Sequence, residues 1–233
     1  MTLIKTQIGR RAFIRNTSLA SGGLVLGFSI LNSCKSKDAE KLAALEMPEE
    51  WFEINAYLKI GDNGLVTIMA PNPEFGQGVI TSMPMIVADE LDVDWKNVLV
   101  EQANFDQEDY GWQFTGGSQG IRRRWEGLRM AGATAKQMLK EAAAQTWQVP
   151  VAEITVAKGV LSHTATNKSA GFGEMASIAA NLEVPEEVPL KEVKDFTIIG
   201  TSKKSVENHK IVTGKPLFGI DYQFDGALTA MVV

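Results

Sequence analysis

Two short stretches, residues 52–60 and 65–70, alternate apolar and polar positions or favour β-branched residues. The tetrapeptide between them, Gly61-Asp62-Asn63-Gly64, has the composition of a tight turn. The pattern therefore predicts a β-hairpin. Another strand is predicted at residues 98–102, where three apolar residues are consecutive.

Two longer stretches have the apolar spacing of helices. The first, about residues 79–91, is predicted to have an apolar face that includes Met83 and a polar face that includes Glu90, with Pro84 near enough to its start to be tolerated. The second covers residues 121–147. Its predicted buried side is formed by Trp125, Leu128, Gly132, Ala135, Met138, Leu139, Ala142 and Ala143.

The remaining chain predicts shorter elements. Two strands are expected at residues 154–157 and 160–163, and residues 169–174 are expected to open a helix that ends near residue 182. A proline-rich and acidic stretch, residues 183–193, has the composition of a linker. Further strands are expected at residues 217–222 and 228–233, the last continuing beyond a truncated end. The fold class predicted is α+β, with mixed sheets and helices packed on them.

The N-terminus has the pattern of an export signal. Arg10 and Arg11 form a twin-arginine pair, and the weakly apolar run that follows, residues 17–31, is shorter than the roughly 20 residues of a membrane-spanning helix. An amphipathic first helix is the alternative, but the run has no helical stripe. Residues 1–33 are therefore predicted to be a twin-arginine signal peptide.

The single cysteine, Cys34, follows this run in Leu31-Asn32-Ser33-Cys34, which resembles a bacterial lipobox. Lipidation at Cys34 would anchor the mature chain to a membrane, with residues 34–50 as a charged tether. The protein would then be a periplasm-facing, membrane-anchored lipoprotein. No thiol would remain for a disulfide, a metal or catalysis.

The charge of the chain argues against a nucleic-acid partner. Removal of residues 1–33 takes away four positive charges and no acid, so the formal net charge falls from −5 to −9. The cluster Arg122-Arg123-Arg124 is too short to outweigh that charge.

Two glycine-rich loops, each before a predicted helix, are the strongest candidates for a binding site. The first contains Gly76, Gln77 and Gly78; the second contains Thr115, Gly116, Gly117 and Ser118. Glycine lets a backbone approach a ligand closely, free N–H groups at a helix start favour anions, and Gln77 offers both a donor and an acceptor. Two such loops are expected to converge on one large ligand.

These loops also carry a family resemblance. The strings GQGVITSMPMIVADELDVDWKNVLVEQA, TGGSQG, LRMAGATAKQMLKEAAAQTW and HKIVTGKPLFGIDYQFDGALTAMVV resemble the molybdopterin-binding large subunit of the xanthine dehydrogenase family. The similarity is greatest to the isoquinoline 1-oxidoreductase beta subunits and related aldehyde dehydrogenases. In the family's usual order the last string comes first. The reversed order here suggests the permuted arrangement of the isoquinoline branch.

The resemblance implies roles for the two loops and a division of the chain. Gly76, Gln77 and Gly78 match the loop against the molybdenum centre, and Thr115, Gly116, Gly117 and Ser118 match the second pterin or phosphate contact. Residues 51–195 would be the molybdopterin-binding domain. Residues 196–233 would begin a second, β-rich, hammerhead-like module.

The implied activity is that of a molybdenum hydroxylase, which oxidises N-heterocycles or aldehydes with oxygen from water. The resemblance implies molybdopterin in its cytosine dinucleotide form and iron–sulfur clusters on a small partner subunit. Electrons would pass from that subunit to a cytochrome or quinone system. The family's catalytic glutamate would lie beyond Val233, so no catalytic residue and no protein ligand to a metal is assigned here. A non-catalytic exported lipoprotein, either a degenerate or a truncated paralogue that binds a partner, is the alternative.

Other polar and aromatic positions have plainer explanations. His163 and His209 are expected at the surface or in hairpins, because neither has an acid or thiol at metal-ligand spacing. Glu74 is interpreted as a helix-start charge and Glu90 as part of a solvated face. The alternating aromatics Tyr110, Trp112 and Phe114 either line a substrate funnel or pin their loop to the sheet, and pinning is favoured.

The lipidation of Cys34 can be tested directly by mass. We expect membrane-extracted protein to begin at Cys34 and to carry acyl chains there. An intact mass that shows unmodified Cys34 still joined to Ser33 would exclude the lipid anchor.

Overall fold

The structure is a computed structural model that describes residues 46–215 and 218–232. The chain divides into two units, Met1–Glu46 and Met47–Val233, of which the second is described below. The predicted signal peptide, Cys34 and residues 34–45 of the predicted tether lie outside the described residues. Among the residues that are described, no helix is both long and apolar enough to cross a bilayer.

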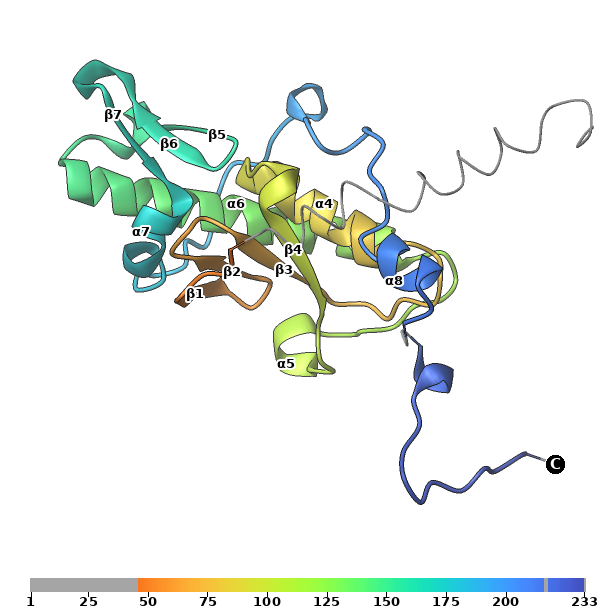
Figure 1. The fold of residues 1–233 in the computed structure, drawn as a ribbon. Helices are drawn as coiled ribbons and strands as arrows, with labels where there is room; N and C mark the ends of the chain where they lie inside the picture. The colour runs from red at the N-terminus through yellow and green to blue at the C-terminus, as the bar shows by residue number, and fades with distance from the viewer. Residues whose placement is uncertain (1–45, 216–217, 233) are drawn as a thin grey trace, which may run out of the picture. The chain divides into compact units, whose positions relative to one another are not determined.

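A four-stranded sheet carries the centre of the fold (Figure 1). Its strands are β1 (Trp51–Asn55), β2 (Leu58–Gly61), β3 (Val66–Ala70) and β4 (Val98–Gln102), in that spatial order. The first three are antiparallel, and β4 runs parallel to β3. The predicted turn at residues 61–64 and the strand at residues 98–102 are confirmed.

The single strand predicted at residues 52–60 is wrong, because the chain turns back within it. The side-chain oxygen of Asn55 accepts the N–H of Tyr57 at 2.9 Å, a local bond that closes a turn between β1 and β2. The amide nitrogen of Asn55 donates to the carbonyl of Ala131 at 3.0 Å, which fixes the turn against a distant helix.

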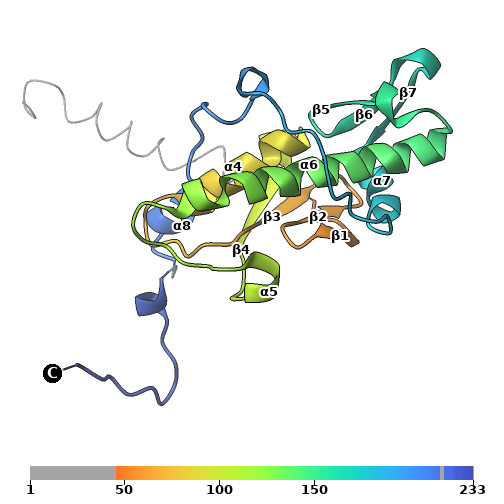
Figure 2. The same cartoon turned by 180° about the vertical axis from the view of Figure 1, so that it is seen from behind.

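Two long helices pack against each other beside this sheet (Figure 2). Helix α4 (Val79–Leu91) connects β3 to β4 and contacts both, and helix α6 (Gly120–Trp147) lies along α4. Both helices are confirmed to within one residue. The two helices approach closely at Gly132, where an added Cβ would lie 2.3 Å from the carbonyl oxygen of Val87.

A second, three-stranded antiparallel sheet follows α6. It consists of β5 (Thr155–Ala157), β6 (Val160–His163) and β7 (Lys168–Gly171), and helix α7 (Phe172–Ala179) packs between α6 and the first sheet. The helix expected from residue 169 begins later, because residues 168–171 pair with β6 and extend the sheet. It also ends at Ala179, short of the predicted residue 182.

The other helical elements described, in the connections and in the C-terminal part, are short. These are α5 (Gln107–Tyr110) before α6, α8 (Asn208–Val212), and single 3₁₀ turns at Trp95–Asn97, Val151–Glu153, Thr164–Thr166, Val193–Asp195 and Gly219–Asp221. The strands predicted at residues 217–222 and 228–233 are wrong for the residues described there. A strand requires a pairing partner, and Leu228 and Val232 are fully exposed instead. The predicted domain boundary near residue 196 stays a prediction.

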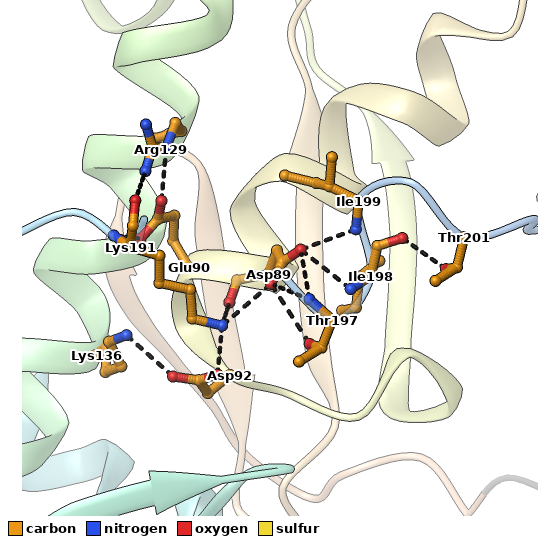
Figure 3. Close-up of polar contacts among 10 residues, drawn as sticks. All are labelled: Asp89, Glu90, Asp92, Arg129, Lys136, Lys191, Thr197, Ile198, Ile199 and Thr201. Carbon is orange, nitrogen blue, oxygen red and sulfur yellow. Dashed lines mark hydrogen bonds and ion pairs between the residues drawn. The ribbon is translucent and has the colours of Figure 1, made fainter. Parts of the chain in front are cut away.

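Two buried carboxylates at the C-terminal end of α4 hold residues 191–199 against the helix (Figure 3). Glu90, predicted on a solvated face, is fully buried: Arg129 Nε donates to it at 2.6 Å and the N–H of Lys191 at 3.1 Å. The prediction failed because a later segment covers that face. An unpaired buried carboxylate would be costly, and these donors remove the cost.

Asp89, also fully buried, accepts three consecutive main-chain N–H groups. Thr197, Ile198 and Ile199 donate at 3.1, 3.0 and 2.8 Å, and Lys191 Nζ lies 3.1 Å from the same carboxylate. Burial tends to raise the pKa of Asp89, but the N–H groups and Lys191 outweigh it and lower the pKa. The charged carboxylate of Asp89 therefore binds the segment that follows the linker, residues 197–199, to α4.

The tight packing of α4 on α6 predicts opposite effects of one substitution at two glycines of α6. Gly132→Ala should destabilise the protein by about 2 kcal/mol, because the new methyl group meets the backbone of α4. Gly127→Ala, where an added Cβ meets nothing within 4 Å, should stabilise it by about 0.5–1 kcal/mol. Thermal unfolding measures both. Equal shifts in the two variants would contradict this packing.

The hydrogen bonds to the charged carboxylate of Asp89 predict that the protein loses stability in acid. Because the folded pKa lies below the ordinary value of 3.8, the contribution of Asp89 is present above that pH and is lost as pH falls through the folded pKa. Asp89→Asn should cost about 3 kcal/mol at pH 7 and should flatten the loss of stability on acidification. Urea unfolding at pH 7 and pH 3 measures this. Asp195→Asn, on the exposed part of the same segment, is the control, and similar behaviour of both variants would contradict the role of Asp89.

Candidate functional site

The two glycine loops meet at one backbone carbonyl. The oxygen of Pro73 accepts the Nε2 amide of Gln77 at 3.0 Å and the hydroxyl of Thr115 at 2.9 Å. The two loops therefore lie together, as the prediction required, and their convergence on one large ligand stays a prediction. The chain reaches this point from β3 on one side and from β4 through α5 on the other (Figure 1).

Three polar side chains that the sequence analysis did not assign to the site hold the loops together. Asn72, only 2% exposed, donates to the carbonyl of Phe114 at 2.7 Å and accepts from Arg124 Nε at 3.1 Å. Gln113 donates to the carbonyl of Pro71 at 2.9 Å. Arg124, which belongs to the basic cluster of residues 122–124, also donates to the carbonyl of Trp112 at 2.7 Å. The sequence signal for this role was weak: an asparagine four residues before Gly76.

An acidic side chain within the first loop accepts the main-chain N–H groups of that loop. The carboxylate of Glu74 accepts the N–H groups of Gly76, Gly78 and Ile80 at 2.6, 3.0 and 2.9 Å. Burial tends to raise the pKa of Glu74, but hydrogen bonds from Gly78, Ile80 and Gly76 outweigh it and lower the pKa. Glu74 is thus confirmed as the helix-start charge. The expectation that these N–H groups are free to hold an anionic ligand is wrong, because Glu74 already occupies them.

Gln77 is folded back onto its own loop. Its Oε1 accepts the N–H of Phe75 at 2.8 Å while its Nε2 donates to Pro73. Gly76 and Gly78 have φ angles of 106° and 87°, and an added Cβ at either would meet nothing within 4 Å. The loop therefore leaves open space beside a carboxamide that keeps one N–H and one lone pair for a ligand.

The second loop has the opposite character. Within the described residues, the N–H groups of Thr115, Gly116, Gly117 and Ser118 donate to no protein acceptor. Gly117 and Ser118 lie in the left-handed region, with φ angles of 60° and 54°, just before the start of α6. Consecutive N–H groups at a helix start suit an anionic oxygen, so this donor set fits the phosphate of a pterin cofactor.

The aromatic residues of the connecting loop divide into two groups. Tyr110 donates to the carbonyl of Ala56 at 2.7 Å and packs edge-on against Tyr57, so pinning to the sheet is confirmed for it. Trp112 and Phe114 instead stack on each other 4.7 Å apart, with Arg123 over the tryptophan. Both rings are about half exposed and do not pin the loop.

Neither histidine joins this site. His163 lies at the end of β6, as expected for a hairpin, but it is 3% exposed and bonded to Thr166 and Glu153, so the surface position is wrong. His209 is exposed on α8. Across the part of the chain that the structure describes, no group of three or more His, Cys, Asp or Glu side chains could hold a metal ion.

Comparisons with known proteins give the site a context. The family model of the molybdopterin cofactor-binding domain matches residues 18–223. Isoquinoline 1-oxidoreductase subunit beta of Brevundimonas diminuta is 28% identical over 97% of this chain and 33% of its own length. Membrane-bound aldehyde dehydrogenase [pyrroloquinoline-quinone] of Gluconacetobacter polyoxogenes is 28% identical over 96% of this chain and 29% of its own length. The chain thus spans a third or less of these relatives.

Among solved structures, reconstituted CO dehydrogenase from Oligotropha carboxidovorans aligns with a TM-score of 0.43 and 24% identity. The alignment covers 55% of this chain and 16% of that one.

The two loops are predicted to differ in their response to inorganic phosphate. In the unsubstituted protein, phosphate should shift the amide resonances of Gly117 and Ser118 and leave those of Gly76 and Gly78 unchanged. Glu74→Ala should make the first loop respond as well, at a cost of about 1 kcal/mol in stability for the lost cap. Glu108→Ala, which removes an exposed acid of α5, is the control. A response of Gly76 and Gly78 before substitution would contradict the role of Glu74.

Proposed function

The chain belongs to the molybdopterin cofactor-binding domain family, and we propose that it forms part of the large subunit of a molybdenum hydroxylase. The proposed reaction is the oxidation of an N-heterocycle or an aldehyde with oxygen from water. Relatives named as isoquinoline 1-oxidoreductase and aldehyde dehydrogenase support this reaction class. The observation that carries the proposal is the meeting of both glycine loops at the carbonyl of Pro73.

The two loops would hold different parts of the cofactor. We propose that the cofactor is in its cytosine dinucleotide form. Its anionic oxygens would be bound by the free N–H groups of residues 115–118 and the hydroxyl of Ser118. Gln77 would offer its remaining N–H to a polar edge, and Gly76 and Gly78 would leave room for the ring system. Glu74 would keep the phosphate away from the first loop by like-charge repulsion. The cofactor supplies a redox-active molybdenum centre when bound.

The proposed enzyme would also need other polypeptide segments. Iron–sulfur clusters would be held by a small partner subunit and would pass electrons to a cytochrome or quinone system. The name of the relative from Brevundimonas diminuta, a subunit beta, supports the existence of a partner subunit. No catalytic residue is assigned to this chain. Residues 196–233 would begin the hammerhead-like module.

The proposed location is the periplasmic side of a membrane. Export by the twin-arginine route allows a protein to cross already folded with its cofactor, and the lipid on Cys34 would anchor it. The twin-arginine pair and the lipobox-like sequence support this location. The mass measurement at Cys34 tests the anchor.

Metal and nucleotide analysis of the complete protein, purified with its partner, tests the function. We expect near-stoichiometric molybdenum, and cytidine monophosphate after acid hydrolysis. Gly117→Val should lower the content of both several-fold, because a β-branched residue is strained in the left-handed region. Gly127→Ala is the control and should keep the full content. The absence of both molybdenum and pterin from the unsubstituted complex would refute the proposal.

A further inference from the structure

A cleft of about 260 Å³ opens beside the first glycine loop. Pro73 and Glu74 line it from that loop, Phe105 and Gln113 from the connection after β4, and Glu207 and Phe218 from the C-terminal part. Its volume is just below the roughly 300–1,000 Å³ of sites for drug-sized ligands, so one small ring system is the size that suits it.

Glu207 brings a carboxylate to the lining of the cleft. The residue is 8% exposed, and the neighbouring N–H of Val206 donates to Thr81 at 3.1 Å, which fixes Glu207 against α4. One carboxylate oxygen lies 3.4 Å from Lys210 Nζ. The other accepts no hydrogen bond from any described residue. That oxygen is open to the cleft and not fully buried, so it can accept a hydrogen bond from a ligand there.

Among the other polar side chains of the cleft, Gln102 leaves an acceptor. Gln102 Nε2 donates to the carbonyl of Ala70 at 2.8 Å, which leaves its Oε1 unused. Gln113 leaves none, because its Nε2 donates to two backbone carbonyls at 2.9 and 2.8 Å and its Oε1 accepts the N–H of Asp106 at 2.6 Å. The oxygens of Glu74 are already bonded, but its negative charge remains. The lining side chains therefore present negative charge and acceptors, together with two aromatic rings.

We propose that this cleft binds a small planar cation with an amidine-like edge. Two adjacent N–H groups on one edge would satisfy Glu207 and Gln102, and the flat ring would pack against Phe105 and Phe218. A carboxylate or phosphate would meet Glu74 and Glu207 and would be repelled. This assignment stands on the cleft alone and does not depend on molybdenum chemistry.

Calorimetric titration of the cofactor-free protein with benzamidine tests the site, with benzoate as its anionic counterpart. We expect benzamidine to bind and benzoate not to bind. Glu207→Gln should weaken benzamidine binding about tenfold, as loss of one charge-assisted hydrogen bond would. Glu187→Gln, on the exposed linker, should leave the affinity unchanged.

Lys210→Met provides a second variant with the opposite expectation. Because Lys210 competes for the carboxylate of Glu207, its removal should tighten benzamidine binding several-fold. This result keeps the test meaningful if Glu207→Gln fails to fold. Equal affinity of Glu207→Gln and Glu187→Gln, a Lys210→Met affinity that is no tighter, or preferential binding of benzoate would overturn the proposal. None of these outcomes would change the molybdenum content, so failure here is separate from failure of the proposed function.

Discussion

Helix α4 is held at both ends by a carboxylate that accepts three main-chain N–H groups, and the rest of the unit depends on this arrangement. Glu74 takes the N–H groups of its own helix start, where a negative charge also favours the helix dipole. Asp89 takes those of residues 197–199 near the helix C-terminus, where the dipole opposes it. Lys191 offsets that opposition. The first carboxylate shapes a loop, and the second brings the C-terminal part of the chain back to the same helix.

Local patterns predicted the elements whose partners lie nearby. Residues 79–91 and 98–102 have clear apolar spacing and pack on β3, so pattern and structure agree. The strand expected over residues 52–60 failed because one asparagine bonds to the N–H two residues later and turns the chain. The helix start expected at residues 169–171 was wrong because these residues pair with β6 and form a strand. The nearby glycines had indicated a helix start. Each error arises from one interaction, a side-chain hydrogen bond or a strand pairing, that cannot be predicted from the spacing of apolar residues.

The candidate site was predictable as two loops but not as a set of contacts. Glycine and hydroxyl content identified residues 76–78 and 115–118, and their convergence followed from the expectation of one ligand. The bonds that join them link residues about 40 to 50 positions apart, such as Asn72 with Phe114 and with Arg124. Sequence gave no reason to pair these residues. The same distance in sequence hid the burial of Glu90, whose partner Lys191 lies 101 residues away.

The region around the carbonyl of Pro73 is therefore electrically asymmetric. The N–H donors of the second loop have no acceptor among the described residues, whereas the cleft beside the first loop presents acceptors and negative charge. A ligand with anionic oxygens at one end and N–H groups at the other would be oriented by this asymmetry alone, because reversal would place like charges together. The carboxylate that caps α4 produces much of it: by occupying the N–H groups of the first loop, Glu74 removes a site for anions and adds a charge that repels them. The carboxylate that caps α4 thus also favours binding of anionic groups at the second loop over the first.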